Sequence, residues 1–248
     1  MVEMNIREKI LFYKKIPTND IGIMICDLNE TIFSVNENKT FRSASTIKLF
    51  ILSYYLDYYK TFDKIIQIPE YKYVESSIIT ELNTTNATIG KLLILMMASS
   101  DNTATNILIE NVGFDKINNY ISNLGIKNTS LKRYMMDFKA VESGLDNIST
   151  AYDTIIILKY LSKNQEALEI MAKQKNDVRL TRYIYNDNIK FYGKNGELGN
   201  AFNDTGIFFI NNNFIFSAVY TRNIEREKAA ELCGLCGLLA INESTFVI

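Results

Sequence analysis

Apolar positions along this chain follow two different periods, and the change between them outlines its elements. Near the N-terminus, alternating apolar residues at 21–28 and 31–36 predict two strands joined by a short turn, and together these form a hairpin. Apolar residues from about 45 to 59 recur instead with helical spacing, as do those at 3–15. The chain is therefore predicted to open with a helix and a hairpin and then to become helical.

The middle of the chain is predicted to be mainly helical. Thr88 caps the start of one helix, whereas Gly113 and Gly125 end two others. Between 128 and 148 the periodicity is weak, which predicts a long, ordered loop. The helices expected in this region cover 88–99, 103–111, 114–124, about 150–163 and 165–174.

Strand patterns return near the C-terminus. Segments 188–196, 204–210 and 214–222 are predicted strands, and a last helix is expected over about 224–241. Three asparagines at 211–213 predict a turn, because Asn tolerates the left-handed backbone that a tight turn needs.

Strands at both ends around a helical middle predict an α+β fold. We expect an antiparallel sheet built from both chain ends and flanked by helices, with an inserted all-helical lobe. The predicted division places residues 1–42 and 184–248 in a discontinuous α/β domain and residues 43–183 in a helical domain.

The composition is that of an ordinary globular protein, with 47% apolar and 22% charged residues. The net charge of −1 provides no electrostatic footprint for nucleic acid, so that class of partner is excluded. There is no apolar run long enough to span a membrane and no signal-peptide core at the N-terminus. We expect a cytoplasmic protein if Met1 is the native start, and otherwise a secreted one whose leader has been removed.

The absence of histidine narrows the chemistry most. It excludes Ser-His-Asp and Cys-His catalysis and any His-ligated metal, so a proton carrier here must be Lys, Asp, Glu, Tyr or water. Cys233 and Cys236 form a C-x-x-C spacing inside an apolar predicted helix, with no second pair to complete a zinc site. We expect these cysteines to pack in the core, and we expect no metal and no cofactor.

Three short motifs could carry chemistry. Ser45 and Lys48, at i and i+3 near a helix start, share one face, and a partly desolvated lysine there can take a serine proton. About one such spacing is expected by chance in a chain of this size, and Ser45 could equally be a helix cap. The second and third motifs are Ser100-Asp101-Asn102, between two predicted helices, and Lys194-Asn195-Gly196, at the end of a predicted strand.

Each motif also has a purely structural interpretation. Ser-Asp-Asn residues favour capping turns, although the motif is expected only about 0.1 times by chance. Lys-x-Gly alone is typical of an exposed β-turn. The order and spacing of all three together, however, resemble those of the class A β-lactamase family, and the likeness covers nearly the whole chain.

The resemblance implies roles for individual residues. Ser45 would be the acylating nucleophile and Lys48 its base, and Ser100 would pass a proton to the leaving nitrogen. Asn102 would hold the side-chain amide of the substrate, and Lys194 would supply positive charge for its carboxylate. The implied substrate is a small β-lactam or a peptide-like amide.

The resemblance also implies an oxyanion hole formed by the backbone N–H groups of Ser45 and Glu197, the residue after Gly196. Two positions depart from the family pattern. Asn195 replaces a hydroxyl residue, and Phe202 stands where many relatives carry an arginine that binds the substrate carboxylate.

The predicted loop departs further. In the family this loop carries a glutamate that activates the deacylating water and an asparagine that helps to hold the water. Here Met135 and Lys139 occupy those positions, and a thioether cannot accept a proton at neutral pH. Asp137 and Glu142 are the nearby carboxylates; Asp137 either staples the loop or serves as a substitute base.

These departures favour a serine hydrolase that is acylated at Ser45 and then deacylates slowly or by an unconventional route. Two alternatives remain open at this point. One is an intracellular peptidase or esterase that uses the same Ser-Lys pair. The other is a binding or sensor module that keeps the pocket without turnover.

Overall fold

The computed structural model describes residue 10, residues 17–175 and residues 179–244. The helix expected over 3–15 lies outside these residues, apart from Ile10. Among the described residues, no helix is both long and apolar enough to cross a membrane.

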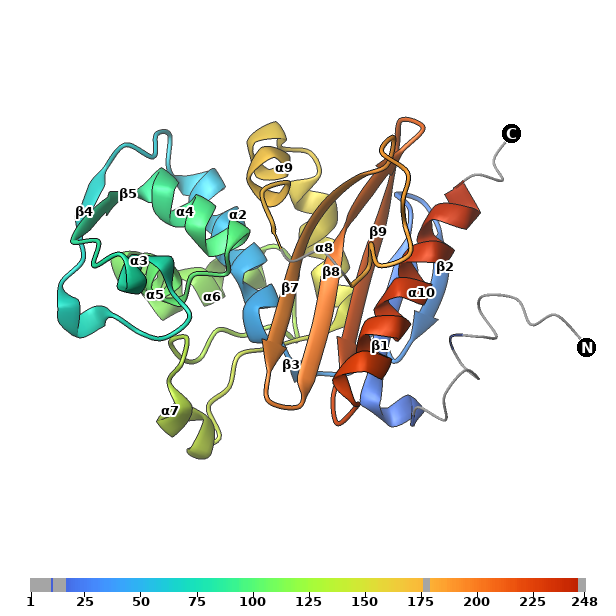
Figure 1. Ribbon diagram of the computed structural model, residues 1–248, viewed down its shortest axis with the longest axis horizontal. Coiled ribbons are helices and arrows are strands. Elements are labelled where there is room, and N and C mark those ends of the chain that lie inside the picture. Colours follow the sequence, from blue (N-terminus) through green and yellow to red (C-terminus); the bar gives the residue numbers. More distant parts are fainter. Residues whose placement is uncertain (1–9, 11–16, 176–178, 245–248) are drawn as a thin grey trace, which may run out of the picture.

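One antiparallel sheet of five strands, in the order β2-β1-β9-β8-β7, joins the two ends of the chain (Figure 1). The predicted hairpin and the predicted C-terminal strands are therefore confirmed, as is the α+β class. Its strands are β1 (Ile21–Cys26), β2 (Thr31–Val35), β7 (Lys190–Leu198), β8 (Ala201–Ile210) and β9 (Asn213–Thr221). Two small sheets pair β3 (Phe41–Arg42) with β6 (Ile148–Ser149), and β4 (Ile65–Gln67) with β5 (Asn86–Thr88).

Most helices begin at a residue whose side chain accepts a hydrogen bond from the first turn. Asp101, Thr150 and Asn164 cap their helices in this way, as does the predicted cap Thr88. The longer helices are α2 (Lys48–Tyr58), α4 (Ile89–Ala98), α5 (Asn102–Val112), α6 (Phe114–Asn123), α8 (Ala151–Leu161), α9 (Gln165–Met171) and α10 (Arg226–Ser244). Shorter helical turns are η1 (Thr18–Asp20), η2 (Ala44–Ile47), η3 (Glu70–Lys72), α3 (Ile78–Glu81) and α7 (Phe138–Glu142).

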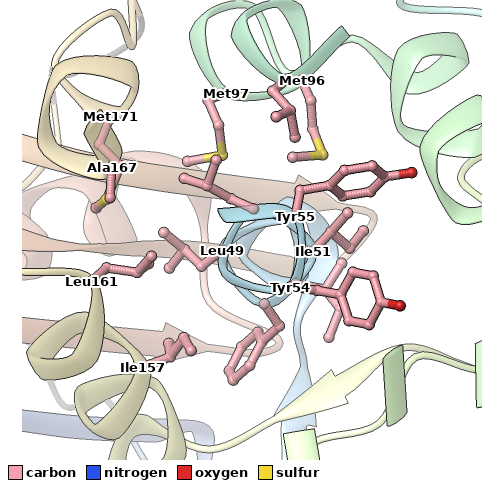
Figure 2. Packing of buried hydrophobic residues seen from close by; sticks show 14 of the residues in the cluster. Leu49, Ile51, Tyr54, Tyr55, Met96, Met97, Ile157, Leu161, Ala167 and Met171 are labelled. Atoms are coloured by element: carbon pink, nitrogen blue, oxygen red, sulfur yellow. The ribbon is translucent and has the colours of Figure 1, made fainter. Parts of the chain in front are cut away.

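Helix α2 is the centre of the helical part of the molecule. Its residues from Lys48 to Tyr55 are buried on every side, which fits a helix with apolar residues all round. Figure 2 shows α2 end-on, with neighbouring side chains around it. Those neighbours are Met96 and Met97 from α4, Ile157 and Leu161 from α8, and Ala167 and Met171 from α9.

The sheet is covered on both faces, because side chains alternate along each strand. Ile23 and Ile25 of β1 pack in one apolar cluster with α10, whereas Met24 and Cys26 belong to the cluster that includes α8. Cys233 and Cys236 of α10 are fully buried in the first cluster, and burial raises the pKa of both thiols. Their predicted packing role is confirmed.

Several boundaries differ from the prediction. The helix expected from 45 begins as the 3-10 turn η2, and α2 starts at Lys48. The expected loop over 128–148 contains the short helix α7, and β6 begins at its end. The Lys-Asn-Gly motif lies inside β7 rather than at its end. The segment between α2 and α4, expected to be helical, also contains the β4–β5 hairpin, because such short strands have too few residues to show a period of two.

Candidate active site

Ser45 lies in η2, the turn that joins β3 to α2. Ala44 before it has a left-handed backbone (φ 46°), which is uncommon for a residue other than glycine and marks a constrained turn. Hydrogen bonds hold the turn from both sides: Ser43 N donates to the Asn147 carbonyl at 2.9 Å, and Asn203 Nδ2 donates to the Arg42 carbonyl at 2.8 Å. The partly exposed Ser45 side chain therefore stands on a fixed support.

Lys48 is completely buried at the first turn of α2. Its Nζ donates to the Ser100 carbonyl at 2.7 Å, to Ser100 Oγ at 3.0 Å and to Asn102 Oδ1 at 3.0 Å. Burial and the nearby ammonium of Lys194 lower the pKa of Lys48 well below its ordinary value, against the opposing effect of Asp101. A lysine in this state can act as a neutral amine that accepts a proton.

The Ser100-Asp101-Asn102 turn faces this lysine and also caps α5. Ser100 has a left-handed backbone (φ 60°). The buried carboxylate of Asp101 accepts hydrogen bonds from Ser77 Oγ at 2.8 Å and from the backbone N–H of Ala104 at 2.8 Å. The capping interpretation therefore holds for Asp101, while Ser100 and Asn102 are directed at Lys48.

Strand β7 brings the third motif to the same place. Lys194 is fully buried, and desolvation lowers its pKa to about 7, although the carboxylate of Asp204 counteracts this effect. A Cβ on Gly196 would lie 2.7 Å from Ser45 N and 2.9 Å from the Ser43 carbonyl oxygen. Only glycine lets β7 approach η2 this closely. The pocket beside Ser45 is lined by Ala44, Ser45, Asn102, Arg133, Met135, Met136, Glu197 and Leu198.

Hydrogen bonds between the Met135 backbone and the Asn106 side chain fix Met135 at the edge of this pocket. Met135 N donates to Asn106 Oδ1 at 2.7 Å, and Asn106 Nδ2 donates back to the Met135 carbonyl at 3.1 Å. Its side chain is buried in the core cluster. The loop is anchored further by Arg133, which forms a salt bridge with Asp146 at 2.8 Å.

Asp137 staples the loop. Its carboxylate accepts from the backbone N–H of Ala140 at 3.0 Å and caps α7. It lines a different cavity, of about 280 Å³, and is not part of the lining of the pocket beside Ser45. Lys139 and Glu142 are exposed on α7 and line neither. Among the described residues, the lining of the Ser45 pocket contains one carboxylate residue, Glu197.

A family model described as the beta-lactamase enzyme family matches residues 5–243, nearly the entire chain. The chain belongs to this family. None of the curated proteins compared with it matches.

Solved structures of beta-lactamases and of PBP-A share the fold of this family member. A beta-lactamase from Sphaerobacter thermophilus is 24% identical, with a TM-score of 0.85 and 98% of each chain covered. A class A beta-lactamase from Bacteroides cellulosilyticus is 21% identical, with a TM-score of 0.83 over 98% of this chain and all of the other. PBP-A is 19% identical, with a TM-score of 0.83 over 98% of this chain and 97% of the other.

Two arginines, Arg179 and Arg226, hold the side chain of Glu197. The sequence motifs of this beta-lactamase family member did not predict either of them. Glu197 Oε2 accepts from Arg179 Nη2 at 2.9 Å, and Oε1 accepts from Arg226 Nε at 2.9 Å. Arg179 Nη1 also donates to the Gly196 carbonyl at 3.2 Å. The two arginines fix the end of β7, and with it the backbone of Glu197.

Phe202 lies beneath this arginine pair. The Arg179 guanidinium carbon is 3.7 Å from the centroid of the Phe202 ring, which packs against Ala229 and Ala230 of α10. The Phe202 ring therefore supports the Arg179 guanidinium by stacking against it. Arg179 is distant in sequence from every motif, so periodicity and spacing gave no signal for it.

Among the described residues, no three His, Cys, Asp or Glu side chains come together in a way that could hold an ion.

Proposed function

We propose that this chain is a serine hydrolase that is acylated at Ser45 by a β-lactam or a related peptide-like amide and that releases the acyl group slowly. The observation that carries the proposal is the environment of Lys48. Its amine is buried, has a lowered pKa, and contacts both Ser100 Oγ and Asn102 Oδ1. In a chain without histidine, such an amine can take the proton of a nucleophilic serine.

In the proposed acylation, Ser45 Oγ attacks the carbonyl carbon while its proton passes to Lys48 Nζ. The oxyanion accepts hydrogen bonds from the backbone N–H groups of Ser45 and Glu197. The C–N bond then breaks, and the leaving nitrogen takes a proton from Ser100 Oγ, which Lys48 reprotonates. Asn102 holds the side-chain amide of the substrate, and Lys194 with Asn195 and Gly196 faces its carboxylate.

The proposed slow step is hydrolysis of the Ser45 ester, since water needs a base there and Met135 has none to offer. Asp137 uses its carboxylate to cap α7 and lines another cavity. Removal of a positioned general base costs about 10² to 10⁴ in rate. A structural relative is consistent with the acylation step: a leucine-to-glutamate mutant of PBP-A, 19% identical to this chain, has been solved as an acyl-enzyme complex with penicillin G.

Intact-mass spectrometry after mixing with penicillin G tests the proposal. We expect a covalent adduct of one penicillin G molecule per chain that forms quickly and persists, and no adduct in the Ser45→Ala variant. Absence of any wild-type adduct would contradict acylation by a β-lactam and favour a peptidase, an esterase or a pure binding module. An adduct that turns over rapidly would contradict slow deacylation.

The sensor function is the second candidate, and the loop favours it. A pocket whose serine is acylated by a ligand and keeps the acyl group reports the presence of that ligand. A long-lived adduct with no product accumulation over many adduct lifetimes would distinguish this use of the site from slow hydrolysis.

A further inference from the structure

At one end of the sheet, β3, the β7–β8 turn and the end of β9 come together (Figure 1). A third cavity lies there. Its volume is about 400 Å³, within the range of small-molecule sites. It shares no lining residue with the pocket beside Ser45. The lining residues are Thr40, Phe41, Arg42, Ile148, Asn200, Arg222 and Asn223.

The cavity is positively charged. Arg42 and Arg222 are the charged residues of its lining, and no carboxylate is among them. Arg42 Nε donates to Asp146 Oδ2 at 2.5 Å, and Arg222 Nε donates to Asp20 Oδ1 at 3.1 Å. Each aspartate therefore holds one edge of a guanidinium and fixes its orientation.

The other edges of both guanidiniums remain available. Within the described part of the chain, Nη1 and Nη2 of Arg42 and of Arg222 donate no hydrogen bond to protein. Asp146 also pairs with Arg133, which lines the pocket beside Ser45 and not this cavity, so the carboxylate of Asp146 compensates the charge of Arg42 only in part. The excess positive charge and the four unused donor nitrogens favour an anion.

Phe41 and two asparagines complete the lining. The Arg222 guanidinium carbon lies 5.8 Å from the centroid of the Phe41 ring, so an aromatic face and a cation adjoin each other. Asn200 Nδ2 donates to Asn223 Oδ1 at 2.5 Å, which orients the pair. Asn223 has a left-handed backbone (φ 55°), a conformation that the surrounding structure must support.

We propose that this cavity binds a small phosphate monoester. Its phosphate group accepts from the free edges of Arg42 and Arg222, because planar guanidinium forks match phosphate oxygens. The cavity is larger than phosphate alone requires, so the organic part of the ester packs against the apolar part of the lining, which Ile148 and Phe41 provide. This site is independent of the acylation proposed for Ser45.

Titration calorimetry on the full chain at constant ionic strength tests the site with phenyl phosphate and inorganic phosphate as probes. We expect phenyl phosphate to bind with a dissociation constant below about 1 mM and more tightly than inorganic phosphate. Arg222→Gln removes a charged donor and should weaken binding about tenfold or more. Asn200→Asp keeps both arginines and places a carboxylate in the lining, so it should weaken binding as well.

Arg182→Gln is the matched control. Arg182 is an arginine in a single ion pair with Glu227, and it does not line the cavity. This variant should bind phenyl phosphate as the wild type does. The proposal is overturned by three results: no binding of phenyl phosphate at about 1 mM, equal affinity for inorganic phosphate, or equal losses in the Arg182→Gln and Arg222→Gln variants. Either of the first two results would exclude a site for a phosphate ester. The third would mean that the positive charge of the whole protein, and not this cavity, attracts the ligand.

Discussion

The buried amine of Lys48 determines the pH dependence that we expect for acylation. Its pKa is lowered by burial and by Lys194. In the acylation that we propose, the neutral amine takes the Ser45 proton. The acylation rate should therefore rise as the pH increases through this lowered pKa. Lys48→Ala should acylate at least about 10² times more slowly and lose this rise, as measured by stopped-flow mixing with a chromogenic cephalosporin.

Lys91, an exposed lysine of α4, provides the control for that experiment. Lys91→Ala should keep the wild-type rate and profile. An unchanged acylation rate in Lys48→Ala would show that another group takes the proton of Ser45.

Met135 determines the lifetime that we expect for the acyl-enzyme. Asn106 holds the main chain of Met135 by two hydrogen bonds, so we expect a polar side chain of similar length to leave the backbone in place. Met135→Glu should shorten the lifetime of the penicillin adduct by about 10² to 10⁴ through a new general base. Time-resolved intact-mass spectrometry measures this lifetime directly.

Met135→Gln separates basicity from shape, because glutamine has the size of glutamate and cannot accept the proton. Equal acceleration in both variants would mean that the thioether obstructs water rather than lacking basicity. In the sequence, Lys139 lies at the position where the family carries the asparagine that helps to hold the deacylating water. The structure exposes Lys139 on α7, outside the lining of the Ser45 pocket, so a change there is not needed for this test.

At the scale of elements, the contact between β7 and η2 assembles the site. Gly196→Ala would place a methyl group 2.7 Å from Ser45 N, where backbone and not a flexible side chain is in the way. The strand must move outward, and the Glu197 N–H then leaves the position in which we propose that it donates to the oxyanion. Loss of one oxyanion donor costs about 10² to 10³ in rate, so acylation should fall by at least that factor.

Circular dichroism and the adduct assay together check this prediction. Gly90→Ala is the control: a Cβ there also meets a neighbour, the Phe62 side chain at 3.2 Å, but far from the β7–η2 contact in the chain. A folded Gly196→Ala variant with wild-type acylation would show that β7 does not hold an oxyanion donor.

Sequence patterns predicted the elements that have enough residues to show a period. The strands of the sheet and the helices from α4 to α6 are such elements, and their caps and glycines were visible in the sequence. The 3-10 turn η2 and the β4–β5 hairpin are too short for that. The motifs located Ser45, Lys48 and Ser100, since their chemistry needs fixed residue types. Arg179 and Arg226 were missed because they reach Glu197 only through tertiary packing.

At the scale of the whole molecule, the two faces of the sheet place opposite buried charges close to each other. Lys194 and Asp204, on adjacent strands β7 and β8, are both fully buried. Burial raises the pKa of Asp204 to about 6, while hydrogen bonds from the Leu180 and Thr205 backbone and the charge of Arg179 limit the rise. Because burial shifts the pKa values of Lys194 and Asp204, the stability of the fold depends on pH.

The sign of this dependence follows from proton binding. Between its ordinary value near 4 and about 6, Asp204 keeps its proton in the folded state and has lost it in the unfolded chain. The free energy of unfolding should therefore fall as the pH rises through this window, by about 3 kcal/mol for a shift of about two units. Lys194 acts in the opposite sense at higher pH: its lowered pKa makes stability rise as the pH increases above about 7.

Urea unfolding at a series of pH values from 4 to 6 measures the Asp204 contribution by difference. Asp204→Asn removes the titrating group and keeps the volume, so the fall in unfolding free energy that the wild type shows should be largely absent in this variant. Asp115→Asn, at an exposed position of α6, should retain the wild-type slope and corrects for the loss of one surface charge. Parallel pH profiles for wild type and Asp204→Asn would mean that Asp204 is already ionised in the folded state at pH 4. The positive charges of Lys194 and Arg179 would then outweigh the desolvation of its carboxylate.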